Sequence, residues 1–358
     1  MTADTVGGVW TYALELAAAL QPHGVEIALA TMGTRLSPGQ RAELACCGNV
    51  TLFESAYDLE WMNDPWEDVD RAGEWLLEIA ARFRPDLVHL NGYSHAALDW
   101  NVPVVVVAHS CVLSWWRAVL GEEAPSSYDE YARRVAAGLR AATAVIAPTA
   151  AMLSSLREEY GADLDGHVIP NAIRHDLFAP APKRPVIFAA GRIWDEAKNL
   201  RMLDRIAPRL RWPIEVAGEV VHPNGHVVEI DNLHSLGRLT RGRLAARLAS
   251  AAIYASPARY EPFGLSPLEA GLCGAALVLG DIPSLREIWQ DAALFVSPDD
   301  EEGTVQTLSG LIANTVRREE LGLRARHRAL EFRPDKMAAA YREVYAGCLS
   351  NVEAEVTG

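Results

Sequence analysis

Short runs of apolar residues alternate with amphipathic helical patterns along almost the whole chain. Runs rich in Val, Ile and Ala predict strands in the first half at 25–31, 86–91, 102–109, 143–148 and 166–170. A second series of predicted strands follows at 185–191, 213–218, 234–238, 251–257, 275–280 and 293–298. Apolar positions spaced by three and four residues predict intervening helices, for example over 71–83, 128–142 and 241–251. This alternation predicts an α/β protein whose parallel sheets are covered by helices on both faces.

The alternation stops at a proline-rich segment without periodicity, residues 170–184. We therefore expect two doubly wound, Rossmann-like domains, residues 1–169 and 185–333, joined by a linker over 170–184. A last helix, 334–350, lies beyond the second predicted sheet, and we expect it to pack back on the first domain. Ligands of such sheets bind at the carboxyl ends of the strands, which predicts a binding cleft between the domains.

A glycine pair, Gly7 and Gly8, stands directly before the first amphipathic helix. A glycine turn that opens a helix is typical of a phosphate-binding loop, but such a loop normally follows a buried strand. Only six residues precede the glycines, so we hypothesise that the chain as written begins late in its first strand. Taken alone, the pair predicts a simple turn equally well. The spacing is not G-x-G-x-x-G, which disfavours a nicotinamide cofactor.

The composition narrows the class of function. The net charge of −14 disfavours nucleic acid as a partner, because binding to phosphate backbones needs a basic surface. The acidic segment 58–78 would be repelled by an anionic bilayer, and no apolar run approaches 18 residues. Five cysteines without metal-ligand spacing indicate reduced thiols. We predict a cytoplasmic enzyme without stable membrane insertion, with transient contact with the inner membrane left open.

The most specific pattern lies between residues 258 and 280. Glu261 and Glu269 stand eight residues apart, with Gly264 between them and a predicted helix beginning near Ser266. Gly264 lets the backbone approach a ligand closely, and the amides at a helix N-terminus favour an anion. Carboxylates beside an anion site are suited to accept hydrogen bonds from hydroxyl groups. The pattern therefore predicts a ligand with a central phosphate flanked by hydroxylated groups, as in a sugar nucleotide.

Two cations follow the first predicted strand of the second domain. Arg192 and Lys198 are six residues apart on the segment that leaves the strand 185–191. At a strand end near an anion-binding helix, they could offset the charge of a departing nucleoside diphosphate, a task that other enzymes give to a metal ion. Taken alone, two such residues are more often solvated surface charges.

Together, the glycine pair, "HS" after a buried strand, "GR" followed by Lys198, and "EPFGLSPLE" resemble glycosyltransferase family 4. The resemblance covers essentially the whole chain. It implies the GT-B fold and retaining transfer of a hexosyl unit from a nucleotide-sugar donor to an acceptor hydroxyl, without a metal or other cofactor. Polysaccharide or glycoconjugate synthesis is the implied setting. The acceptor would attack the sugar from the face on which the phosphate departs, and the departing phosphate would help to deprotonate it.

The resemblance also implies roles for matching residues. Arg192 and Lys198 would hold the diphosphate, Glu261 a hexose hydroxyl, and Glu269 the ribose. The backbone of Phe263, Gly264 and Leu265 would lie beside the hexose, and Arg238 would lie near the base. His109 would line the donor-sugar site, and the loop with Gly7 and Gly8 would approach the phosphates.

Three tryptophans are candidates for the acceptor side, Trp10, Trp115 and Trp116, although the Trp pair 115–116 more often reflects packing. The chain departs from the family pattern at Ala172, where glycine is common after Asn, and at Asn91, where a second histidine often follows His89. Neither departure affects the residues expected at the diphosphate.

Two other interpretations stay open, and a third is disfavoured. One is a sugar-nucleotide epimerase of the same fold, and another is a non-catalytic sugar-nucleotide-binding module. The third is a metal-dependent, single-domain transferase, suggested by the pairs Asp68/Asp70 and Asp163/Asp165. Neither aspartate pair directly follows an apolar strand, so solvated carboxylates explain them better.

Overall fold

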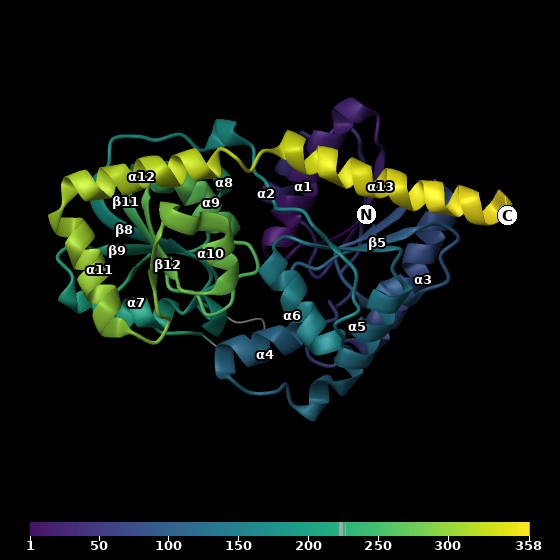
Figure 1. Cartoon of the computed structure of the whole chain (residues 1–358), viewed down its shortest axis with the longest axis horizontal. Coiled ribbons are helices and arrows are strands. Elements are labelled where there is room, and N and C mark those ends of the chain that lie inside the picture. Colours follow the sequence, from purple (N-terminus) through teal and green to yellow (C-terminus); the bar gives the residue numbers. More distant parts are fainter. Residues whose placement is uncertain (222–224, 226, 358) are drawn as a thin grey trace. The chain divides into compact units, whose positions relative to one another are not determined.

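The computed structural model describes residues 1–357 apart from 222–224 and 226, with side chains described up to residue 350 apart from those four. The chain divides into two compact units (Figure 1). The first unit contains residues 1–117, 121–172 and the segment from Pro334 onward. The second contains residues 118–120 and 173–333.

The strands of the first unit form two parallel sheets. One has the order β1-β2-β3, and the other has the order β4-β5-β6-β7. Their bounds are β1 Thr2–Asp4, β2 Ile27–Met32, β3 Val50–Glu54, β4 Val88–Leu90, β5 Val104–Val107, β6 Ala144–Ala147 and β7 His167–Val168.

Asn91, directly after β4, joins the two sheets of the first unit. Its backbone N–H donates to Thr2 Oγ1 at 2.9 Å, and its Nδ2 donates to the Thr2 carbonyl at 2.7 Å. Strands β1 and β4 are therefore neighbours, and the winding of the chain reverses between them. In doubly wound folds such a reversal opens a crevice at the carboxyl ends of the two strands.

The helices of the first unit surround these sheets. They are α1 Gly8–Leu20, α2 Pro38–Leu44, α3 Trp66–Phe83, α4 Val112–Leu120 apart from its last three residues, α5 Asp129–Ala141, α6 Ala150–Tyr160 and α13 Pro334–Thr357. Helix α13 runs along α1 (Figure 1), and its buried face, Met337, Ala338 and Tyr341, shares one apolar cluster with Leu16 and Val105. The C-terminal helix therefore completes the core of the first unit.

The second unit contains one parallel sheet of order β10-β9-β8-β11-β12-β13. The reversal of winding falls between β8 and β11, which are direct neighbours. The strands are β8 Arg184–Ala190, β9 Ile214–Ala217, β10 His234–Ser235, β11 Ala251–Ser256, β12 Ala276–Gly280 and β13 Leu294–Val296. The helices are α7 Leu200–Ile206, α8 Arg241–Ser250, α9 Leu265–Leu272, α10 Pro283–Trp289, α11 Glu301–Ala313 and α12 Thr315–Ala329.

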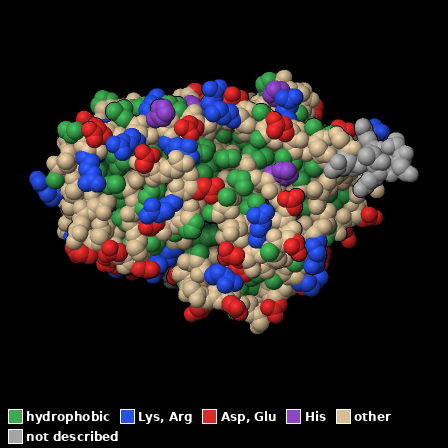
Figure 2. Space-filling view, viewed as in Figure 1, with side chains coloured by type: hydrophobic (Ala, Val, Ile, Leu, Met, Phe, Trp, Pro, Cys, Tyr) green, Lys and Arg blue, Asp and Glu red, His purple; other side chains and the backbone are tan. Residues whose placement is uncertain are grey.

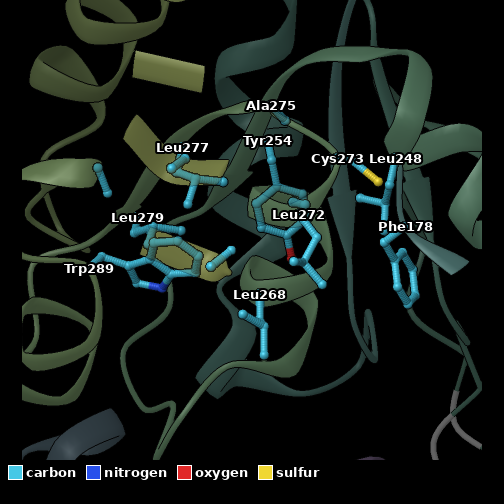
Figure 3. Close-up of a cluster of buried hydrophobic side chains, with 14 of the residues drawn as sticks. Phe178, Leu248, Tyr254, Leu268, Leu272, Cys273, Ala275, Leu277, Leu279 and Trp289 are labelled. Carbon is cyan, nitrogen blue, oxygen red and sulfur yellow. The ribbon is translucent and has the colours of Figure 1, made fainter. Parts of the chain in front are cut away.

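Successive residues of the central strands fill opposite faces of this sheet. Figure 3 shows Leu277 and Leu279 of β12 gathered with Trp289 on one face. Ala276 and Val278 belong to the apolar cluster of the other face. Because side chains alternate along a strand, apolar residues at every position require cover on both faces, which the helices supply.

All eleven predicted strands are present, most of them shorter than predicted. The sequence pattern missed β3, a short edge strand with partly exposed side chains. Seven short 3₁₀ helices complete the described structure: η1 Gln21–His23, η2 Ser94–Ala97, η3 Ser126–Tyr128, η4 His175–Leu177, η5 Glu196–Lys198, η6 Ala207–Arg209 and η7 Gln290–Ala292.

Charged side chains of both signs are interspersed on the face that Figure 2 presents. The net negative charge is therefore not gathered into one field on that face. Within the described residues, every helix falls short of the length and apolarity needed to cross a membrane.

The buried faces of β12 give a test of the packing. Leu277 is 0% exposed and belongs to the cluster of Figure 3, whereas Leu323 on α12 is 69% exposed. We expect Leu277→Ala to lower the free energy of unfolding of the second unit by about 2–5 kcal/mol, because it leaves a cavity. Leu323→Ala should change it by less than about 0.5 kcal/mol. Urea unfolding followed by tryptophan fluorescence measures both, and equal losses would contradict this packing.

Candidate active site

The loops that follow β8, β11 and β13 are tied together at the carboxyl edge of the second sheet. The Arg259 N–H donates to the Ala197 carbonyl at 2.8 Å. Asn199 has a positive φ of 52° and donates through Nδ2 to the carbonyls of Pro257 and Pro298, at 3.0 and 2.8 Å. These bonds hold the segments carrying Arg192, Lys198 and Glu261 in one rigid cluster.

Two glycines let the loops after β8 and β9 approach each other. A Cβ atom on Gly218 would lie 1.7 Å from the Gly191 carbonyl oxygen, so a larger residue would displace the backbone. Gly191 in turn donates to the Ala217 carbonyl at 3.0 Å. The backbone leading into Arg192 is therefore packed against the neighbouring loop.

Arg192 is held by the loop that carries it. Its Nη2 donates to Asp195 Oδ2 at 2.6 Å, and its guanidinium lies 5.0 Å from the ring centroid of Trp194. The same aspartate caps η5 by accepting the Ala197 N–H at 3.0 Å. Burial raises the pKa of the Asp195 carboxyl, but the charges of Arg192 and Lys198 and these hydrogen bonds outweigh it, so the pKa lies below its usual value. Asp195 is thus a buried anion that orients Arg192.

The structure brings Lys198 and Glu261 into direct contact across the β8–β11 junction. The Lys198 ammonium donates to Glu261 Oε2 at 2.5 Å, with the two side chains 20% and 15% exposed. Ser284 donates through Oγ to the Glu261 carbonyl at 2.5 Å, which fixes the backbone of this loop. Two motifs 63 residues apart in sequence therefore meet at one point.

The second glutamate lies on α9, which begins at Leu265, one residue before the predicted start. Gly264 precedes the helix with a φ of 93°, and a Cβ there would lie 3.1 Å from Pro267 Cγ. Glu269 is buried on this helix. Burial raises the pKa of Tyr254, and the charges of Glu261 and Glu269 raise it further. The charges of both carboxylates therefore act on the same buried hydroxyl group.

The carboxyl edge of the first unit has a different character. Gly7, with a φ of 120°, precedes α1, and both it and Gly8 are exposed. His109 follows β5, and its Nε2 lies 2.8 Å from Asn91 Oδ1. The Tyr12 ring packs edge-on against the His109 imidazole with centroids 4.4 Å apart. Burial lowers the pKa of His109 to about 3, so the ring is neutral at pH 7.

Three other candidate residues differ in exposure and partners. The segment carrying Arg238 adjoins the loops after β8 and β9, because Gly218 donates to the Gly237 carbonyl at 3.0 Å and Ile193 donates to the Glu219 carbonyl at 2.8 Å. Arg238 is exposed and pairs with Glu219 at 3.3 Å. Trp115 packs against Trp116 with ring centroids 5.9 Å apart. Trp10 is 3% exposed and donates from its indole to Glu43 at 2.8 Å. The Trp10 ring therefore lies in the core of the first unit, and its role as an acceptor contact stays a prediction.

Comparison with known proteins decides the family. A model described as Glycosyltransferase Family 4 matches residues 6–177, and one described as Glycosyl transferases group 1 matches residues 184–314. The chain belongs to glycosyltransferase family 4.

Sequence relatives of this glycosyltransferase include the D-inositol 3-phosphate glycosyltransferase of Xylanimonas cellulosilytica. It is 28% identical over 401 aligned residues, which cover 95% of this chain and 91% of the relative. The alpha-maltose-1-phosphate synthase of Mycobacterium tuberculosis is 27% identical over 281 residues, covering 66% and 70%. The chain is a glycosyltransferase enzyme.

Solved structures establish the fold of this glycosyltransferase. The sucrose-phosphate synthase from Thermosynechococcus elongatus matches with a TM-score of 0.82 and 18% identity, covering 98% of this chain and 96% of that one. Anabaena HepE in complex with UDP-glucose matches with a TM-score of 0.74 and 16% identity, covering 97% and 98%. These likenesses and the two Rossmann-like units confirm the predicted GT-B fold.

Sequence reasoning missed several residues that shape the clusters of this glycosyltransferase, notably Asp195, Asn199 and Tyr12. A signal for the first was present, because an aspartate two residues before Ala197 is typical of a helix cap. Among the described residues, no group of three or more His, Cys, Asp and Glu side chains is arranged to hold a metal ion.

The buried histidine His89 gives this glycosyltransferase a defined pH dependence of stability. Burial lowers its pKa to about 3, whereas an unfolded histidine titrates near 6.5. Between these values the unfolded state binds a proton that the folded state does not, so stability falls as pH falls below about 6.5. From pH 7 to pH 5 the loss from this residue should be about 2 kcal/mol.

Urea unfolding at pH 7 and pH 5 measures this loss. His89→Gln should show a smaller loss than the wild type, because glutamine does not titrate. His23→Gln is the matched control, since His23 is exposed on the same unit. An equal loss in both variants would show that burial of His89 does not set the pH dependence.

Proposed function

We propose that this enzyme transfers a hexosyl unit from a nucleoside diphosphate sugar to an acceptor hydroxyl, with retention of configuration and without a metal ion. The observation that carries the proposal is the contact between Lys198 and Glu261 at the β8–β11 junction. It places a cation suited to phosphate and a carboxylate suited to a sugar hydroxyl side by side, next to the first turn of α9.

Both cations keep donors for a ligand while paired. Lys198 has three N–H donors and gives one to Glu261, and Arg192 has five and gives one to Asp195. A diphosphate can therefore bind both side chains without first breaking either pair. The diphosphate would take the place of the solvent around the exposed part of the Arg192 guanidinium. Such preorganised donors stabilise the charge that develops on a leaving group.

The two glutamates differ in environment, which suits two different hydroxyl groups. Glu261 accepts Lys198 through Oε2, which leaves Oε1 to accept from a hexose hydroxyl. Glu269 is buried on α9, at the position that the family resemblance assigns to the ribose. Glu261 is committed to an ion pair, and this favours a binding role over that of a nucleophile.

The proposed step is a same-face exchange at the anomeric carbon. The bond from this carbon to the diphosphate oxygen breaks, and a bond to the acceptor oxygen forms on the same face. The acceptor proton passes to the departing phosphate. Arg192, Lys198 and the amides at the start of α9 would stabilise the diphosphate as it leaves, which makes leaving-group charge the main target of catalysis.

The names of related proteins guide the choice of substrates for assay. HepE was solved with UDP-glucose, and two relatives are named for reactions that involve inositol 3-phosphate or maltose 1-phosphate. UDP-glucose is therefore the first donor to test, with other nucleoside diphosphate hexoses beside it. Hydroxylated phosphates such as inositol 3-phosphate and glucose 1-phosphate form the first acceptor panel.

Removal of either cation tests the proposed function. We expect Arg192→Ala and Lys198→Ala each to lower kcat on the order of 100-fold or more, because a preorganised charged donor is lost. Arg205→Ala is the control, since Arg205 pairs with Glu301 at 2.6 Å on the surface of the same unit. Release of nucleoside diphosphate measures turnover, with and without EDTA. Unchanged kcat in both cation variants, or loss of wild-type activity on chelation, contradicts the proposal.

Glu269 should affect binding more than turnover. We expect Glu269→Gln to weaken nucleotide binding about tenfold with a smaller change in kcat, because hydrogen bonds to a charged group contribute about 1.5–3 kcal/mol. Calorimetric titration with UDP and with the other nucleoside diphosphates measures the dissociation constants. Glu302→Gln, an exposed change on the same unit, is the control. Equal affinities in the two variants would remove Glu269 from the nucleotide site.

A further inference from the structure

A chain of hydrogen bonds runs inside the first unit from the C-terminal helix to His109. The hydroxyl of Tyr345, on α13, lies 2.6 Å from His89 Nδ1. His89 Nε2 lies 3.2 Å from Asn91 Oδ1, and the same oxygen lies 2.8 Å from His109 Nε2. Elements far apart in sequence thus meet in one polar network, bounded by the aromatic rings of Tyr12 and Tyr341.

The orientation of the Asn91 side chain follows from its partners. Its amide group lies 2.7 Å from the Thr2 carbonyl, which can only accept a hydrogen bond. The nitrogen of the amide must therefore face Thr2, and the oxygen must face the two histidines. The Asn91 backbone N–H, which donates to Thr2 Oγ1, holds the residue in this position.

This orientation determines where His109 carries its proton. The Asn91 oxygen only accepts, so the His109 nitrogen next to it, Nε2, must donate. Burial lowers the pKa of His109 to about 3, so the ring is neutral and carries one N–H. Its Nδ1 is then a hydrogen-bond acceptor, to which no other described residue donates. The edge-on Tyr12 ring restricts rotation of the imidazole.

The same reasoning applies one step further along the network. His89 is also neutral, because burial lowers its pKa to about 3. The Tyr12 hydroxyl lies 3.4 Å from His89 Nε2, farther than the Asn91 oxygen at 3.2 Å. If Nε2 donates to the Asn91 oxygen, the Tyr12 hydroxyl can only accept at this nitrogen and Nδ1 must accept the Tyr345 hydroxyl, so every bond in the chain has one donor and one acceptor. The Asn91 oxygen receives two donors, which is its full capacity.

We propose that Tyr345, His89 and Asn91 are positioning residues that hold His109 as the Nε2–H tautomer, so that Nδ1 accepts a hydrogen bond from a ligand hydroxyl. A nitrogen that only accepts is repelled by phosphate oxygens, which also accept. The network therefore directs His109 to the sugar and away from the diphosphate. The choice of a sugar hydroxyl rests on the proposed function, whereas the tautomer itself does not.

Nuclear magnetic resonance of the full chain with ¹⁵N-labelled histidine tests the tautomer without any substrate. The spectra of His109→Gln and His89→Gln identify the two rings. We expect His109 Nε2 to carry the proton at pH 7 and Nδ1 to be unprotonated. In Tyr345→Phe the His89 Nδ1 loses its donor, so His89 should shift toward the Nδ1–H form. A wild-type His109 protonated on Nδ1 would overturn the proposal.

Kinetics on the donor that gives turnover tests whether Tyr345 acts through His109. Loss of one hydrogen bond, about 0.5–1.5 kcal/mol, predicts a two- to tenfold fall in kcat/KM for the donor in Tyr345→Phe. Tyr341→Phe is the matched control, because it removes a hydroxyl one turn away on the same helix. Melting temperatures verify that both variants are folded.

A double-mutant cycle separates positioning from a structural role. In a His109→Gln background, Tyr345→Phe should have no further effect on kcat/KM, because the ring that it orients is absent. Additive effects, or equal effects of the Tyr345 and Tyr341 changes, would overturn the relay. If the resonance result holds but no nucleotide sugar is turned over, the proposed function fails while the tautomer assignment stands.

Discussion

The ion pair between Lys198 and Glu261 is the interaction on which the candidate site depends. Its two residues stand 63 positions apart and lie on the loops that follow adjacent central strands. Each partner neutralises the other in a half-buried place where a lone charge would be costly. Because Asn199 and the Arg259 amide hold the same loops together, the pair has a fixed place relative to α9. An anion that enters meets a site that is already assembled.

Polar groups buried at a sheet edge are costly unless they have partners, and the two units stabilise them in different ways. The second unit keeps full charges and pairs them, as Arg192 with Asp195 and Lys198 with Glu261. The first unit keeps His89 and His109 neutral by burial and holds both rings against the Asn91 oxygen. Charged donors suit phosphate, and neutral acceptors suit hydroxyl groups, so the two edges differ in the ligand chemistry that each favours.

Much of the fold and part of the candidate site could be predicted from the sequence. Buried parallel strands such as β5 and β12 are apolar at successive positions, and this signal is strong. The Arg192, Lys198 and E-x₇-E patterns led to residues that the structure brings together. The role of Asn91 could not be predicted, because Thr2 and His109 come near it only in the folded chain. Asp195, by contrast, bonds to residues at most three positions away, so its signal was local and was overlooked. The burial of Trp10 could not be read from the sequence, because an aromatic residue after a glycine loop can be either enclosed or exposed.

The return of α13 to the first unit has a consequence for how the protein is made. Residues of α13 fill the apolar cluster that α1 contributes to, yet the whole second unit is translated between them. The apolar cluster of the first unit therefore stays incomplete until α13 has been synthesised. The second unit, nearly continuous in sequence, can fold during that interval. The first unit is thus begun before the second unit and completed after it.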